Sequence, residues 1–131
     1  MKGKSLFFKL FMVIALLIPA FAFAEIKNED VAKVDELIKS GKYTVIDVRT
    51  KEEYDAGHIK GALNIDYYND DFEEKIESQL KDKNKPYILY CRSGMRSLYS
   101  AQILEDLGYT DVTNMKGGFL AWQSAGKPVT E

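Results

Sequence analysis

Short apolar runs alternate with helical patterns along most of the chain. The run over residues 43–48, rich in β-branched side chains, predicts a buried strand, and residues 62–65, 87–90 and 112–115 predict three more. Apolar spacing and end signals predict helices over residues 31–38, 51–56, 72–80 and 98–107, and a last one around Trp122. Strands that alternate with helices indicate right-handed crossovers. We therefore expect one α/β domain with a mainly parallel sheet and helices on both faces.

The first 24 residues follow a different pattern. Three lysines and no acidic residue precede an apolar run over residues 10–24, which ends in Ala22-Phe23-Ala24. This order of charged, apolar and small residues is typical of a secretory signal peptide. The alternative is an uncleaved anchor, but a spanning helix needs about 20 apolar residues. We expect cleavage after Ala24, a domain over residues 25–131, a periplasmic or secreted location, and no membrane association after cleavage.

The charge balance of residues 25–131 argues against some classes of binding partner. Without the first 24 residues, 15 Lys and Arg stand against 20 Asp and Glu. An acidic domain of this kind is a poor ligand for nucleic acid or an anionic membrane. No repeat or linker is visible, and we expect a monomer.

The only cysteine, Cys91, follows a predicted buried strand and precedes a predicted helix. A lone cysteine of this kind is buried and inert, paired to another molecule, or reactive. The carboxyl ends of parallel strands are where such sheets place reactive groups. The turning backbone, the helix N-terminus, Arg92 and Arg96 each favour the thiolate, which is the nucleophilic form. Gly94 allows a positive φ or a close backbone approach. We therefore favour the reactive alternative.

Three stretches resemble the rhodanese family, in the order that the family has them. Cys91-Arg92-Ser93-Gly94-Met95-Arg96-Ser97 resembles its active-site loop, C-x-x-G-x-R-[ST]. Residues 46–65 resemble D-V-R-x3-E-[FY]-x2-G-H-I-x-G-A-x-N, and residues 117–128 resemble G-G-x3-W-x3-G-x-P. The resemblance covers nearly all of residues 25–131. It implies a rhodanese-like fold and a single-domain sulfurtransferase.

The expected reaction moves sulfane sulfur from a donor such as thiosulfate to a thiol or cyanide acceptor, through a persulfide on Cys91. We expect five loop residues to bind the substrate: Arg92, Ser93, Gly94, Met95 and Arg96. Arginines bind an anionic donor through charge-assisted hydrogen bonds. No cofactor is expected, and one histidine with one distant cysteine gives no metal-ligand pattern.

Five residues are expected to support the site: Asp47, Arg49, Glu53, His58 and Ser97. Glu53 lies four positions after Arg49, and we expect these two to form an ion pair that holds the loop. For His58 the resemblance implies hydrogen bonds to backbone around its turn; the alternative is a general base.

Two other functions remain open. Some phosphatases and arsenate reductases resemble this fold, but their loops follow C-x5-R. Here Arg96 follows Cys91 by five positions, giving C-x4-R, which forms a smaller ring better suited to one extra sulfur atom. The other alternative is a non-catalytic binding module. Such modules usually lack the cysteine, which this chain keeps.

Overall fold

The structure is a computed structural model that describes residues 25–131, so the predicted signal peptide lies outside the described residues. The elements are β1 (Lys27–Glu29), α2 (Val31–Lys39), β2 (Thr44–Asp47), α3 (Lys51–Ala56), β3 (Leu63–Asn64), α4 (Phe72–Gln79), β4 (Pro86–Tyr90), α5 (Met95–Asp106), β5 (Asp111–Met115) and α6 (Gly118–Ser124). Every predicted helix and strand is present, with ends that shift by a few residues.

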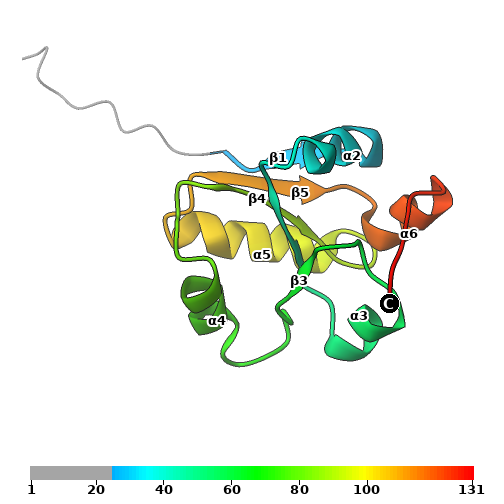
Figure 1. The fold of residues 1–131 in the computed structure, drawn as a ribbon. Coiled ribbons are helices and arrows are strands. Elements are labelled where there is room, and N and C mark those ends of the chain that lie inside the picture. The colour runs from blue at the N-terminus through cyan, green and yellow to red at the C-terminus, as the bar shows by residue number, and fades with distance from the viewer. Residues whose placement is uncertain (1–24) are drawn as a thin grey trace, which may run out of the picture.

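The strands form one parallel sheet in the order β1-β5-β4-β2-β3 (Figure 1). β4 lies at the centre, and its last residue, Tyr90, pairs with Asp47 of β2. Only β1 was not predicted. Its three residues are polar and pair only with β5 at the sheet edge, so no apolar pattern marks them.

The two faces of the sheet bury separate apolar clusters. Tyr87 and Leu89 of β4 pack with α4 and α5, whereas Ile88 and Tyr90 pack with α2 and α6. This alternation follows from the two-residue period of a strand. The predicted parallel sheet with helices on both faces is confirmed. Cys91 continues the alternation, and its side chain lies on the face covered by α4 and α5.

Local sequence signals explain how the short helix α3 begins. The Thr50 hydroxyl accepts from the backbone N–H of Glu53, and the Glu53 carboxylate accepts from the backbone N–H of Thr50, which together form a capping box. The cap fixes where the Glu53 carboxylate lies. Figure 1 shows α3 and α6 at the same end of the sheet, beyond the carboxyl ends of the strands.

Within residues 25–131, no helix combines the length and apolarity needed to cross a bilayer.

Candidate active site at Cys91

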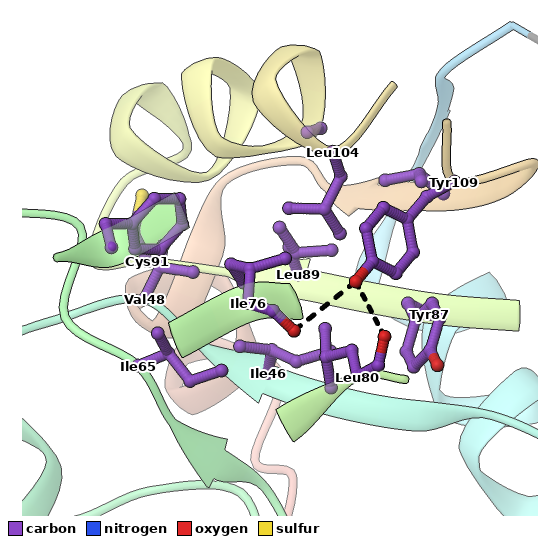
Figure 2. Close-up of a cluster of buried hydrophobic side chains, with 13 residues drawn as sticks. Ile46, Val48, Ile65, Ile76, Leu80, Tyr87, Leu89, Cys91, Leu104 and Tyr109 are labelled. Atoms are coloured by element: carbon purple, nitrogen blue, oxygen red, sulfur yellow. Dashed lines mark hydrogen bonds between the residues drawn. The ribbon is translucent and has the colours of Figure 1, made fainter. Parts of the chain in front are cut away.

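Cys91 is the first residue after the central strand, and its side chain belongs to the buried cluster under α4 and α5. Its exposed fraction is 1%. Figure 2 shows it at one end of this cluster beside Val48, with its sulfur directed toward α5. Burial alone would fit an inert cysteine. The contacts of the sulfur therefore decide what it can do.

Two donors reach the sulfur. The backbone N–H of Gly94 donates to Sγ at 3.1 Å, and the hydroxyl of the fully buried Ser97 lies 3.3 Å from it. The Ser97 hydroxyl also lies 3.2 Å from the Gly94 carbonyl. Its single proton can be donated either to the sulfur or to that carbonyl oxygen. A thiolate is the stronger acceptor. We expected the turning backbone to favour the thiolate; among the backbone N–H groups of the described loop residues, only that of Gly94 is within hydrogen-bond range of the sulfur.

Gly94 is also the N-cap residue of α5. Its φ of 113° is in the region that favours glycine, and no side chain caps the helix there. The N-terminus of this 12-residue helix thus lies next to the sulfur. Its free amide dipoles favour negative charge at that point.

Helix α6 binds the outer side of the same loop. The N–H of Phe119 donates to the Cys91 carbonyl at 2.8 Å, and the N–H of Leu120 donates to the Arg92 carbonyl at 3.1 Å. In a trans peptide the N–H points opposite to the C=O, so the N–H groups of Arg92 and Ser93 point away from α6. No hydrogen bond within the described residues uses either N–H.

Gly118 makes this docking possible. Its φ is +59°, and a Cβ there would lie 2.5 Å from the Cys91 carbonyl oxygen and 2.6 Å from that of Arg92. Real Cβ atoms do not approach backbone so closely. In the sequence the Gly117-Gly118 pair stands out only as the start of the motif over residues 117–128. Its spacing before an amphipathic helix gives no sign of which loop it touches, because that contact joins residues far apart in the chain.

The expected Arg49–Glu53 ion pair is wrong. Glu53 instead binds Arg96 through two parallel contacts, Nη1 to Oε1 at 2.7 Å and Nη2 to Oε2 at 3.0 Å. The four-residue rule holds on one face of a helix, and Arg49 lies before α3 begins at Lys51. Hydrogen bonds from Arg96, with a further one from Thr50, outweigh burial and lower the pKa of Glu53 to about 2.

Arg49 pairs with Asp47 in the interior. The Arg49 side chain reaches Asp47 Oδ2 at 2.7 Å and the Gly57 carbonyl at 2.6 Å, and both residues are buried. Burial acts against the charge of Arg49, but Asp47 outweighs it and raises its pKa. The guanidinium also lies 4.1 Å from the ring centre of Phe119. This buried pair therefore supports the first turn of α6, which in turn holds the Cys91 loop.

His58 lies in the turn after α3. Its Nδ1 is 2.8 Å from the Tyr54 carbonyl, its ring stacks on that of Tyr54 at 3.6 Å, and its backbone pairs with Thr130. These are the backbone contacts that the resemblance implied. The described contacts do not join His58 to Cys91.

The loop's other side chains differ in their exposure and in whether they form an ion pair. Arg92, Ser93 and Met95 are exposed, and Arg92 has no ion pair among the described residues. Arg96 is neutralised by Glu53, and its side chain is only 16% exposed. The one unpaired cation of the loop is thus Arg92.

Within residues 25–131, no group of three or more potential ligands is arranged to hold a metal ion.

Comparisons with known proteins identify related sequences. Residues 30–125 match the family model of the rhodanese-like domain. A putative sulfurtransferase of Bacillus subtilis, YtwF, is 39% identical over 105 residues, which cover 79% of this chain and 97% of that protein. Thiosulfate sulfurtransferase 18 of Arabidopsis thaliana is 34% identical over 116 residues, covering 80% of this chain and 84% of that protein.

Solved structures show the same architecture. The human single-domain sulfurtransferase TSTD1 superposes with a TM-score of 0.65 at 26% identity, covering 79% of this chain and 97% of that chain. These matches confirm the fold class expected from the three sequence motifs.

Proposed function

Because this chain belongs to the rhodanese-like domain family, we propose that it is a sulfurtransferase that carries sulfane sulfur on Cys91. One observation carries the proposal. The sulfur at the end of the central strand accepts hydrogen bonds from Gly94 and Ser97 and lies at the N-terminus of α5. An inert core cysteine needs neither donor, whereas a thiolate and its persulfide are both stabilised by them.

The proposed cycle has two steps. The Cys91 thiolate attacks the outer sulfur of thiosulfate, the S–S bond of the donor breaks, and sulfite leaves with the bonding electron pair. An acceptor, cyanide or a thiolate, then attacks the outer sulfur of the Cys91 persulfide, and Cys91 leaves as a thiolate. Charge and electrons balance in each step, and the covalent intermediate predicts ping-pong kinetics.

The part of the loop available for donor binding is the one whose polar groups have no partner among the described residues. Arg92 is exposed and unpaired, and the N–H groups of Arg92 and Ser93 have no partner among the described residues. We propose that these groups bind the anionic end of the donor. Arg96 holds α5 to α3 through Glu53, so it positions the loop rather than binding the donor. Since Cys91 is 1% exposed, some of the groups that cover it must move before a donor can reach the sulfur.

The phosphatase alternative is less well supported. A C-x5-R loop uses its arginine to bind the phosphate, but here the corresponding Arg96 is one residue closer and already bound to Glu53 through two hydrogen bonds. The presence of Cys91 with its donors likewise argues against a module that only binds.

We also propose that residues 1–24 are a cleavable signal peptide and that the protein acts in the periplasm or outside the cell. The support is the sequence order of lysines, apolar run and Ala22-Phe23-Ala24. N-terminal sequencing of the protein from an envelope fraction should give Glu25 as the first residue. Membrane-bound protein that keeps Met1 would refute it.

The test of the proposed function measures two activities on one preparation. Thiocyanate should form from thiosulfate and cyanide, and Cys91→Ser should abolish it, because a serine hydroxyl cannot carry a persulfide. Hydrolysis of an aryl phosphate should be negligible in the same buffer. If the protein hydrolyses the phosphate faster than it forms thiocyanate, the phosphatase alternative replaces this proposal.

A further inference from the structure

Exposed apolar side chains gather around the mouth of the Cys91 loop. The described residues expose six large apolar side chains: Leu63, Tyr68, Met95, Tyr99, Leu120 and Val129. Scattered residues of this kind are normal, but a contiguous group marks a binding surface. Four of the six, which we call the apolar collar, adjoin the loop: Tyr68, Met95, Tyr99 and Leu120.

Each member of the apolar collar is tied to the loop. Met95 is a loop residue and 58% exposed, and Tyr99, 46% exposed, lies one turn further along α5 on the same face. Leu120 donates its N–H to the Arg92 carbonyl. The ring of Tyr68, 66% exposed, lies 5.4 Å from the Arg96 guanidinium.

An acidic hollow adjoins this collar. Its volume is about 840 Å³, and Tyr68 and Ile103 line it together with five acidic residues: Asp70, Asp71, Glu73, Glu74 and Glu77. Ile103 follows Tyr99 by four residues, so the exposed face of α5 runs from the loop into the hollow. Lysines pair with Asp71 and Glu77, whereas the other three acids have no ion pair among the described residues.

We propose that the apolar collar and the acidic hollow dock a basic polypeptide whose cysteine thiol accepts the sulfur. This inference rests on the proposed function and names the class of its acceptor. Cyanide or a small anionic thiol needs no apolar collar, and unpaired carboxylates repel anions. A lysine-rich polypeptide gains attraction at the hollow and buries Tyr and Met side chains, which are enriched in protein interfaces. A second copy of this acidic chain would bring further carboxylates, which disfavours self-association.

The transfer needs no additional reagent. The acceptor thiolate attacks the outer sulfur of the Cys91 persulfide, the S–S bond to Cys91 breaks, and its electron pair stays on Sγ as a thiolate. The new S–S bond leaves the acceptor as a persulfide, so nothing is oxidised or reduced overall. The persulfide extends Cys91 by one S–S bond of about 2 Å, which carries the transferred atom beyond the buried Sγ.

The experiment compares two synthetic peptides as acceptors. Each has one cysteine and one leucine, flanked in one peptide by lysines and in the other by glutamates. Each transfer rate from the thiosulfate-loaded protein is divided by that peptide's rate with a small disulfide, which removes differences in thiol reactivity. At low salt the lysine peptide should react about tenfold faster, and salt of about 1 M should remove most of this difference.

Surface variants locate the effect. Glu73→Lys with Glu74→Lys should reduce the preference for the lysine peptide to about twofold or less. Tyr99→Ser should slow the lysine peptide by about threefold or more, since it removes buried apolar contact. Leu63→Ser, an equally simple loss of an exposed apolar side chain at β3, is the matched control and should change neither rate. Thiocyanate formation should be unchanged in all of these variants.

The outcomes separate the two proposals. Equal normalised rates for the two peptides, with normal thiocyanate formation, overturn the docking proposal and leave the sulfurtransferase proposal standing. Absence of thiocyanate formation in the unmodified protein overturns both. A concentration-dependent dimer that Tyr99→Ser dissociates would show that a second copy occupies the collar, and would also overturn the docking proposal.

Discussion

The two ends of the central strand β4 differ in the contacts that hold them in place. At its amino end the buried side chains are neutral. Tyr109 donates its hydroxyl to the carbonyls of Ile76 and Leu80, and Tyr87 donates to that of Asp82. Burial raises the pKa of Tyr109 to about 12, so it keeps its proton at any ordinary pH.

At its carboxyl end the contacts are ionic. The Asp47–Arg49 pair is buried, the Glu53–Arg96 pair is half-buried, and Gly118 brings α6 onto the loop backbone. Buried charges cost more to place than neutral hydrogen bonds and give less net stability. The comparison indicates that the amino end serves stability, whereas the carboxyl end holds a loop in one geometry.

The largest expected effect on stability comes from breaking the buried ion pair. Asp47→Asn leaves the Arg49 charge inside the protein without its partner and should lower the free energy of unfolding by about 3–5 kcal/mol. Denaturant titration measures it. Replacing both residues, Asp47→Leu with Arg49→Met, should cost less than the single change. If Asp47→Asn is as stable as the unmodified protein, the unpaired charge of Arg49 costs nothing inside the protein, and the account of this ion pair is wrong.

The next effect tests the docking of α6. Gly118→Ala places a Cβ against two carbonyl oxygens and should cost about 1–3 kcal/mol from overpacking, with thiocyanate formation reduced by about tenfold or more as the loop shifts. Gly126→Ala is the matched control. Its φ of +71° carries similar backbone strain, but nothing lies within 4 Å of the added carbon. Equal activity losses in the two variants would contradict a special role for α6.

The two loop arginines should separate in kinetics. Arg92→Ala should raise the KM for thiosulfate by about tenfold or more, because a hydrogen bond to a charged group contributes about 1.5–3 kcal/mol. It should leave stability unchanged, since Arg92 is exposed and unpaired. Arg96→Ala should lower stability by about 1 kcal/mol, since it leaves the half-buried Glu53 without its partner. Steady-state kinetics and thermal unfolding of both variants measure these effects. A raised KM in Arg96→Ala, with a normal KM in Arg92→Ala, would show that Arg96 binds the donor.

The smallest effect on the reaction is expected at the neutral end. Tyr109→Phe removes one hydroxyl and should lower stability by about 1 kcal/mol. The rate of thiocyanate formation, measured well below the unfolding temperature, should not change. A clear loss of activity in this variant would show that the two ends of β4 are not independent.

The sequence predicted the fold well because every element except β1 is marked locally. The Thr50 cap and the β-branched run before Arg49 both depend on near neighbours. The site depends on contacts across the chain, and there the prediction was partial. The motifs marked the Cys91 loop and the residues around it as a candidate site. They did not give the partner of Glu53, because Arg96 lies 43 residues away.

The central claim is that Cys91 carries the sulfur. Mass spectrometry of the protein after incubation with thiosulfate and removal of the excess tests it most directly. The account predicts one added sulfur atom on the peptide that contains Cys91, which disappears when cyanide is added, and no addition in Cys91→Ser. An unmodified Cys91 peptide in a sample that still forms thiocyanate would contradict it.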